Sequence, residues 1–259
     1  MSESFSFSSA GCTHPGHLRD INQDAYLALP ERGIWLVADG VGGHQRGDVA
    51  SQAIVDAVAG LSLDSSVENP VESVRQRLLS VNLELVQAAR ELGPGAVIGS
   101  TVAALVAVGK QGVCLWAGDS RVYGFRRGRL TRLTRDHSQV EELVARGQLS
   151  VEEARYHPHA NVIYRAIGQD ESLEIDALAY SLAPGDKFLL CTDGLTKELY
   201  DEEIAEILAA GDCQANCHQL MESALKRPCR DNLTVIVVEV QESEDTDTRT
   251  LKRIQIKAE

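Results

Sequence analysis

The chain has 259 residues, of which 44% are hydrophobic and 24% charged, so it can bury a sizeable core. Its 38 acidic residues outnumber 25 lysines and arginines, and the formal net charge of −13 argues against nucleic acid or an anionic membrane as the main partner. The chain starts without a signal-peptide pattern, and apolar runs such as 102–108 are too short to span a membrane, so we expect a soluble cytoplasmic protein.

Apolar runs bounded by Gly, Asp or Pro recur along the chain and predict β-strands. In chain order, they are "SFSFSSAG" (4–11), "AYLALP" (25–30), "GIWLVADG" (33–40), "TVAALVAVG" (101–109), "GVCLWAGDS" (112–120), "RVYGFRRGRL" (121–130), "KFLLCTDG" (187–194) and "LTVIVVEV" (233–240). Short glycine-containing links in "VAVGKQGVCLW" and "YGFRRGRLTRL" predict hairpins. We therefore expect antiparallel pairing.

Helical segments lie between these strand groups. Apolar residues at helical spacing predict helices at 48–61 and 71–92, and further helices at 138–146 and from 201–210 toward Ala224. In "LSVEEA", Ser150 and Glu153 form a capping box before a short turn at 152–155.

Strand groups that alternate with helix pairs favour an α+β fold with antiparallel sheets over a doubly wound parallel sheet. No linker or internal repeat divides the chain. We therefore expect one domain, residues 1–240, followed by a charged tail, residues 241–259.

The six cysteines contain no CxxC pair, which fits a reducing compartment better than a disulfide framework. Cys114 and Cys191 lie inside apolar runs and are expected in the core. Cys213, Cys217 and His218 are close in sequence, which leaves zinc open as an alternative, although no second ligand pair accompanies them.

Four aspartates stand where predicted strands begin or end. Asp39, Asp119 and Asp193 each follow an apolar run, and Asp231 precedes one. An Asp next to Gly is by itself a common turn. If all four converge, however, their mutual repulsion calls for a hard cation with oxygen ligands, and the absence of neighbouring His or Cys favours Mg²⁺ or Mn²⁺.

Residues near these aspartates suit the same chemistry. Gly40 has no Cβ, so its carbonyl oxygen can approach an ion closely, and glycines 42–43 leave space for a bulky anion. In "HPGHLRDINQDA", Arg19 can bind a phosphate dianion through its planar fork, and Asp24 follows it. Taken alone, this motif is equally compatible with a surface arginine and a turn aspartate.

Taken together, the motifs resemble the PP2C (PPM) family of metal-dependent serine/threonine protein phosphatases, especially its compact bacterial members. The match runs in order through "RDINQDA", "VADGVGGH", "GSTVAALVA", "WAGDSRVY", the stretch from "LTRDHS" to "YRAIG", "LLCTDGLTKEL" and "DNLTVIVV", and spans residues 6–240. The resemblance implies a four-layer αββα sandwich, in which helix pairs flank two antiparallel sheets. It also implies a mobile flap at about 136–167 that contacts protein substrates.

The resemblance further implies a site for two Mn²⁺ or Mg²⁺ ions and a third, weaker ion. The residues that match the family pattern are Asp39 (bridging both ions), Gly40 (carbonyl ligand of the second ion), Asp193 and Asp231 (first ion), Asp24 (through water), Asp119 (third ion, with Asp193) and Arg19 (phosphate binding).

Two positions depart from the pattern of many members. Val41 stands where members with "DGHGG" carry a histidine that is a candidate general acid, so the proton must come from metal-bound water or another group such as the nearby His44. Gln23 stands where many eukaryotic members carry a glutamate ligand. Bacterial members commonly show both features.

The implied activity is hydrolysis of phosphoserine and phosphothreonine in proteins, by attack of a water or hydroxide that bridges the two ions. We expect a monomer that acts on phosphorylated proteins and opposes a Hanks-type kinase in bacterial signalling, with secretion-system regulation as one setting. The chain has no Cys-x5-Arg loop of the cysteine-based phosphatases. Two alternatives are a non-catalytic phosphoprotein-binding member and a two-metal phosphodiesterase or nuclease.

Overall fold

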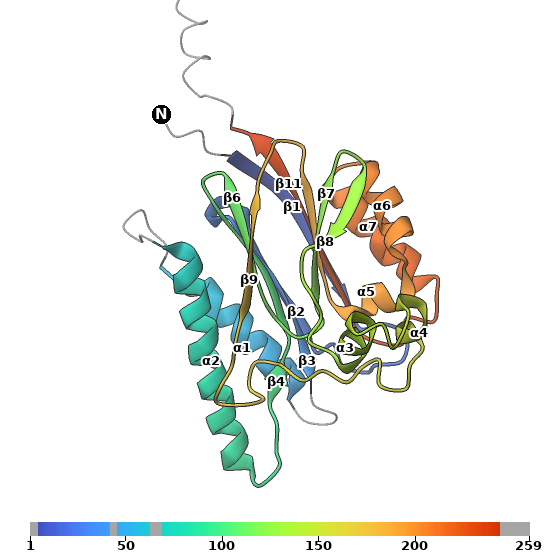
Figure 1. The fold of residues 1–259 in the computed structure, drawn as a ribbon. Coiled ribbons are helices and arrows are strands. Elements are labelled where there is room, and N and C mark those ends of the chain that lie inside the picture. Colours follow the sequence, from blue (N-terminus) through green and yellow to red (C-terminus); the bar gives the residue numbers. More distant parts are fainter. Residues whose placement is uncertain (1–4, 42–45, 63–68, 244–259) are drawn as a thin grey trace, which may run out of the picture.

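The computed structural model describes residues 5–41, 46–62 and 69–243. The strands form two antiparallel sheets that face each other (Figure 1). In spatial order, the first sheet consists of β1 (Phe5–His14), β11 (Leu233–Glu242), β10 (Lys187–Cys191), β7 (Arg121–Arg126) and β8 (Arg129–Arg132). The second consists of β2 (Asp24–Leu29), β3 (Ile34–Val41), β5 (Val102–Val108), β6 (Gln111–Ala117) and β9 (Asp176–Ser181), with β4 (Gly99–Ser100) paired to β3.

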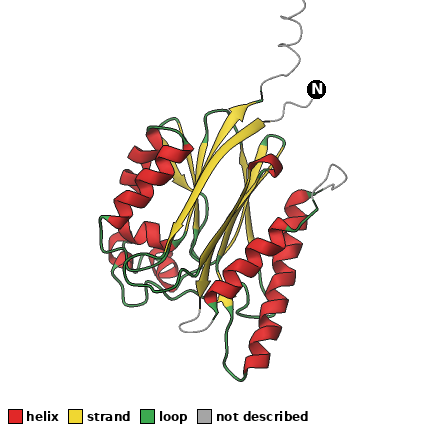
Figure 2. Cartoon of the chain, turned by 180° about the vertical axis from the view of Figure 1, so that it is seen from behind, coloured by secondary structure: helices red, strands yellow, loops and turns green. Residues whose placement is uncertain are grey.

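Helices cover the outer face of each sheet (Figure 2). α1 (Gly47–Ala59) and α2 (Pro70–Leu92) pack on the second sheet, and α6 (Asp201–Ala209) and α7 (Cys213–Leu225) pack on the first. A third apolar cluster, which includes Trp35, Phe188 and Ile236, lies between the sheets. The predicted α+β class and αββα layering are confirmed.

Shorter helices connect these layers. They are the 3-10 helix η1 (Pro30–Arg32), α3 (Gln139–Ala145), α4 (Val151–Arg155) and α5 (Asp193–Glu198). Both predicted hairpins are present, because β5 pairs with β6 and β7 with β8. The predicted capping box opens α4: the Glu153 amide donates to the Ser150 hydroxyl, and the Glu153 carboxylate accepts from the Ser150 amide.

Several elements differ from the sequence-based expectation. The helix expected to continue from 201–210 toward Ala224 is broken at Gly211, whose φ of +75° ends α6, and Asp212 then caps α7 by accepting from the Ala215 amide. Strand β9 and helix α5 were not predicted. Strand β11 also continues two residues past Val240, while residues 244–259 of the expected tail lie outside the described residues.

Candidate active site

The predicted carboxylates come together at one end of the sandwich, and both sheets supply them. Asp24 and Asp39 are cross-strand partners on β2 and β3 of the second sheet. Asp193 follows β10 and Asp231 precedes β11, which are neighbouring strands of the first sheet. Asp119 lies in the connection from β6 to β7, where the chain crosses between the sheets.

Asp24 is held by hydroxyl groups of the opposite sheet. Thr192 Oγ1 and Thr234 Oγ1 both donate to Asp24 Oδ2, at 2.8 and 2.7 Å. The other oxygen, Asp24 Oδ1, is buried without a hydrogen-bond partner, as is Asp193 Oδ1. An unpaired buried oxygen is costly, so these two atoms mark a place that favours a cationic or hydrogen-donating partner.

Burial and mutual repulsion raise the pKa values of most of these carboxyl groups. Burial is the largest cause for Asp24, whose pKa is raised to about 7, and for Asp119, whose pKa is raised to about 8. The pKa of Asp39 is raised well above its ordinary value by burial, then by the charges of the surrounding aspartates. Such crowding of like charges is typical of sites that bind hard cations.

Glycines let the supporting backbone segments approach closely. A Cβ on Gly40 would lie 2.3 Å from the carbonyl carbon of Gly47, where α1 begins. A Cβ on Gly194 would lie 2.0 Å from the carbonyl oxygen of Asn232. The glycines that follow Asp39 and Asp193 are therefore required by backbone packing, beyond the close approach to an ion that the sequence indicates for Gly40.

The backbone of Asp39 is fixed by β4 and the residue after it. Its carbonyl oxygen accepts from the Thr101 amide at 2.8 Å and from Ser100 Oγ at 2.9 Å. Its amide donates to Thr101 Oγ1 at 3.1 Å. These bonds satisfy the backbone of Asp39 and leave its carboxylate for the cluster.

Two cationic side chains contact the carboxylates. Arg19 donates from Nε to Asp231 Oδ1 at 2.9 Å, so the predicted phosphate-binding residue lies beside a predicted metal ligand. Lys197, which the sequence reasoning missed, places Nζ 2.5 Å from Asp193 Oδ2 and 2.9 Å from Asp231 Oδ2. Burial acts to raise the pKa of Asp231, but the charges and hydrogen bonds of Lys197 and Arg19 together lower it below its ordinary value.

The carboxylates fit a hard divalent cation by their chemistry, although their arrangement is not that of a finished coordination shell. Among the described residues, no three acidic, His or Cys side chains already surround one point as metal ligands. The two unpaired oxygens, of Asp24 and Asp193, are nevertheless the donor type that Mg²⁺ and Mn²⁺ prefer. His44 and glycines 42–43 lie outside the described residues.

The zinc alternative is wrong for the described residues. Cys213 and Cys217 are buried on α7 and bond to β1, where Cys217 Sγ donates to the Ala10 carbonyl at 3.0 Å. His218 points to solvent, with its side chain 72% exposed, and pairs with Glu222. Cys114 and Cys191 are buried core residues, as predicted.

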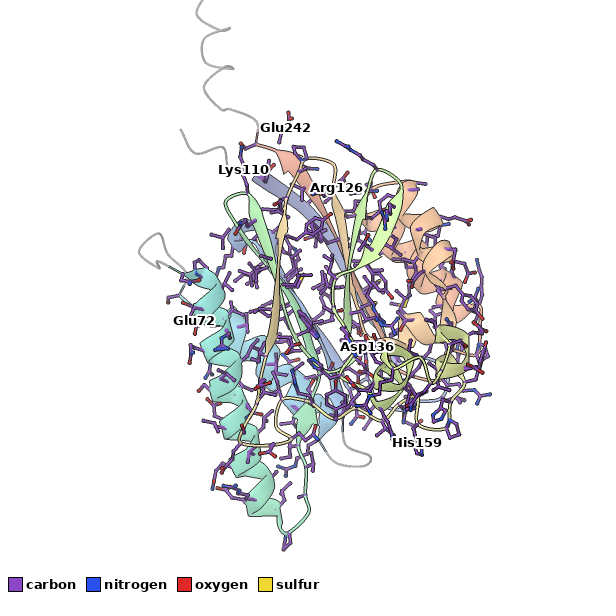
Figure 3. The ribbon with its side chains drawn as sticks, in the orientation of Figure 1. Glu72, Lys110, Arg126, Asp136, His159 and Glu242 are labelled. Atoms are coloured by element: carbon purple, nitrogen blue, oxygen red, sulfur yellow. The ribbon has the colours of Figure 1, made fainter. Side chains whose placement is uncertain are left out.

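A cleft of about 1110 Å³ lies over the aspartate cluster. Its walls come from the predicted flap on one side and from α5 and the start of α6 on the other, and Arg19, Asp119, Asp193 and Asp231 line it. Figure 3 labels two flap residues, Asp136 near the strand ends and His159 farther out. The cleft therefore connects Asp119, Asp193 and Asp231 to solvent beside the flap.

The flap, residues 136–167, is anchored at both ends. Asp136 is held by the guanidinium of Arg121, with contacts of 2.7–3.1 Å to both carboxylate oxygens. Ile167 exchanges two backbone hydrogen bonds of 2.9 Å with Ser100. Between these ends, α3 and α4 bury none of their residues.

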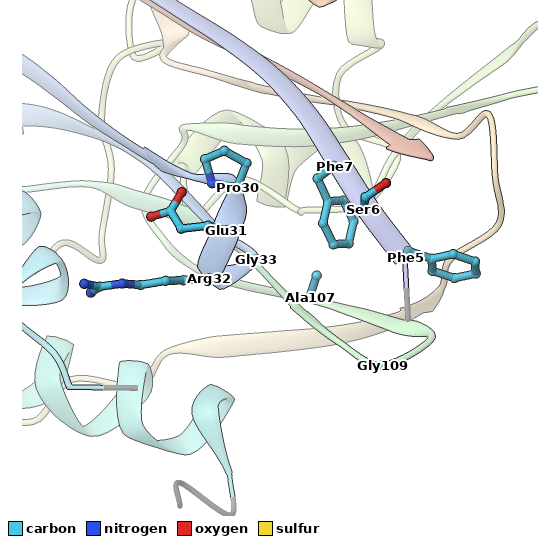
Figure 4. Close-up of a pocket in the computed structure, with 9 residues that line it drawn as sticks. All are labelled: Phe5, Ser6, Phe7, Pro30, Glu31, Arg32, Gly33, Ala107 and Gly109. Atoms are coloured by element: carbon cyan, nitrogen blue, oxygen red, sulfur yellow. The ribbon is translucent and has the colours of Figure 1, made fainter. Parts of the chain in front are cut away.

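A second hollow, of about 580 Å³, lies at the opposite end of the sheets (Figure 4). Phe5 and Phe7 of β1, η1, and the β5–β6 turn line it. Glu31 is the one acidic residue on its wall among the residues that the structure describes. The larger cleft over the aspartates is therefore the candidate active site.

Several solved structures share this sandwich. PppA, described as a key regulatory component of T6SS in Pseudomonas aeruginosa, is 42% identical, with a TM-score of 0.84 over 91% of this chain and 98% of that one. The catalytic domain of the serine/threonine phosphatase PstP, solved with two manganese ions, is 31% identical, with a TM-score of 0.83 over 92% of this chain and all of that domain. The fold thus defines a protein of the PPM phosphatase type.

The model of the protein phosphatase 2C family matches residues 16–234, so the chain belongs to this family. Full-length PstP of Mycobacterium tuberculosis is 34% identical over 226 residues, which are 87% of this chain but only 43% of PstP, so the chain spans less than half of that relative. The phosphatase Stp of Listeria monocytogenes is 32% identical over 235 residues, and the match covers 93% of its length. The family predicted from the motifs is confirmed.

Proposed function

We propose that this protein is a phosphoserine/phosphothreonine protein phosphatase that depends on Mn²⁺ or Mg²⁺. The observation that carries the proposal is the cluster of aspartates from both sheets. It includes two unpaired buried carboxylate oxygens, and its members Asp119, Asp193 and Asp231 line a solvent-connected cleft. Membership of the 2C family and the two manganese ions in the PstP structure support it.

In the proposed site, Asp39, Asp193, Asp231 and the carbonyl of Gly40 would hold the two ions. Asp24 would act through water, and Asp119 with Asp193 would hold a third, weaker ion. When bound, such ions activate a water molecule as the nucleophile and neutralise phosphoryl charge.

The side chains of this chain supply positioning and charge. Arg19 is more than half exposed and lies at the mouth of the cleft, so its guanidinium can turn from Asp231 to a phosphoryl group and bind two of its oxygens. Thr192 and Thr234 keep Asp24 in place through its Oδ2 atom. Val41 has no titratable group, so the proton for the leaving serine or threonine oxygen does not come from that position.

The test is hydrolysis of a phosphothreonine peptide with and without Mn²⁺. We expect Asp39→Asn and Asp193→Asn to lower kcat by at least about a thousandfold, since each removes a charge that stabilises the transition state. Asp20→Asn is the matched control, because Asp20 is an exposed carboxylate one residue from Arg19. Full activity after exhaustive chelation contradicts the proposal.

The physiological setting is a further part of the proposal. We propose that the enzyme acts in the cytoplasm and reverses the action of a serine/threonine kinase, and the identity to PppA favours secretion-system regulation as the setting. None of the helices in the described residues combines the length and apolarity of a membrane span. Phosphoproteomics of a deletion strain tests this setting: loss of the gene must raise phosphorylation at specific serine or threonine sites.

A further inference from the structure

Lys197 provides a positive charge inside the carboxylate cluster. Its ammonium lies 2.5 Å from Asp193 Oδ2 and 2.9 Å from Asp231 Oδ2, so one group joins two residues that we assign to the same ion. An ion pair and a charge-assisted hydrogen bond of this length are strong, because the partners are ionised and water is partly excluded.

The backbone holds Lys197 in this position. Asp193 is the first residue of α5, and Lys197 lies four residues later, so both side chains project from the same face of the helix. The end of α5 is fixed from the flap, since Arg155 Nη2 donates to the Lys197 carbonyl at 2.7 Å. The ammonium is therefore a built part of the site, in contrast to a long surface side chain that samples many positions.

We propose that Lys197 is a built-in counter-cation that keeps Asp193 and Asp231 together and lowers the affinity of the site for divalent ions. This inference rests on the proposed function, because it concerns the same metal ligands. It assigns Lys197 as a positioning residue, which acts through the two aspartates.

The competition follows from shared atoms and charge. An ion that takes Asp193 Oδ2 and Asp231 Oδ2 must displace the ammonium, which breaks its ion pair with Asp193 and its hydrogen bond to Asp231. An ion that binds through the other oxygens, such as the unpaired Asp193 Oδ1, retains a positive charge within a few ångströms. Both routes weaken ion binding, so removal of the ammonium must strengthen it.

The same group stabilises the protein before an ion binds. It offsets the repulsion between the carboxylates of Asp193 and Asp231, from which its ammonium lies 2.5 and 2.9 Å away. Without Lys197, the metal-free protein should be less stable, and an added ion should restore more of its stability. A counter-cation role predicts that a variant without Lys197 is less stable without metal but binds the ion more tightly. A purely structural role predicts that both the stability and the ion affinity of the variant fall.

The experiment is calorimetric titration of chelator-treated protein with Mn²⁺, for wild type and Lys197→Met. We expect Lys197→Met to bind Mn²⁺ about tenfold more tightly, on the scale of one charge-assisted hydrogen bond. Its Tm in chelator should be lower than that of wild type, and its rise in Tm on Mn²⁺ addition larger. Lys197→Arg keeps the charge and should bind within about threefold of wild type.

The control is Arg230→Met, which removes a positive charge from the exposed wall of the same cleft. Its Mn²⁺ affinity should change by less than about twofold, because solvent screens an exposed charge. If Lys197→Met does not fold, Lys197→Gln serves in its place. Unchanged or weaker Mn²⁺ binding in the neutral variants, or no Mn²⁺ binding by wild type, overturns the inference. Binding without hydrolysis overturns only the proposed function.

Discussion

Asp24 makes the metal-free protein sensitive to pH. Burial, the largest cause, raises its pKa from 3.8 to about 7; the Thr234 and Thr192 hydroxyls act in the opposite direction, and the charges of Asp193 and Asp231 add to the rise. The unfolded chain ionises this group near its ordinary value, so the folded state binds a proton more tightly. The stability that protonated Asp24 contributes to the folded state is therefore lost as the pH rises from about 4 to about 7.

The size of the effect follows from that rise in pKa. At about 1.4 kcal/mol per pH unit, a change from 3.8 to about 7 lowers the free energy of unfolding by about 4 kcal/mol at alkaline pH. Asp24→Asn removes the ionisation and keeps an oxygen that can accept from Thr192 and Thr234. At about pH 8 in chelator, the variant should exceed wild type by about 2–4 kcal/mol, and at about pH 4.5 the two should agree within about 1 kcal/mol.

Urea unfolding of chelator-treated protein at the two pH values measures this difference. Asp20→Asn controls for the loss of one surface carboxylate and should show no pH-dependent gain. Mn²⁺ should stabilise wild type more than Asp24→Asn, because the ion offsets the buried charge that the variant lacks. Asp24 does not cause this pH dependence if Asp24→Asn is no more stable than wild type at alkaline pH, or if its advantage is the same at both pH values.

Two further predictions concern the walls of the cleft. Arg155 connects the flap to α5 by donating to the Lys197 carbonyl, and its guanidinium stacks 4.0 Å over the Tyr200 ring. Arg155→Ala should therefore speed amide hydrogen exchange in residues 139–160 by about tenfold, which corresponds to the loss of one charged hydrogen bond. Its kcat/KM on a phosphoprotein should fall severalfold, and that on p-nitrophenyl phosphate by less than about twofold. Gly194→Ala places a methyl group where the Asn232 carbonyl lies, so it should lower stability by about 1–3 kcal/mol and weaken Mn²⁺ binding, as urea unfolding and calorimetry can show.

Each of these two predictions has a clear contrary outcome. Arg146→Ala removes an exposed flap arginine and is the control for Arg155→Ala; equal exchange rates in both variants would show that Arg155 does not fix the flap. A Gly194→Ala protein with wild-type stability and Mn²⁺ affinity would show that the approach to Asn232 is not needed.

The sequence predicts most of the layers, because their strands and long helices carry clear apolar periodicity. Strand β9 is not predicted because most of its residues are exposed and show no regular alternation of buried and exposed positions. Helix α5 is not predicted because it has only six residues and comes directly after a buried strand, so it is too short to show a repeating helical pattern of apolar residues. Missing α5 also hides Lys197, whose position four residues after Asp193 has meaning only within a helix.

The sequence likewise predicts some residues of the candidate site and not others. Strand-end aspartates identify the carboxylates, but nothing local indicates that Asp24 of one sheet accepts from Thr192 and Thr234 of the other. Those contacts depend on how the sheets pack, which is a property of the complete core. The assignment of individual ions to Asp39, Asp193 and Asp231 stays a prediction.

The origin of the carboxylates in both sheets has a consequence for folding. Neither sheet with its own helices contains the cluster, so an intermediate with only one sheet formed cannot assemble the binding site. Divalent ions should therefore leave the early folding steps unchanged and slow the unfolding rate, because they bind only after the sheets have docked. An ion captured there acts as a non-covalent cross-link between the two halves of the molecule.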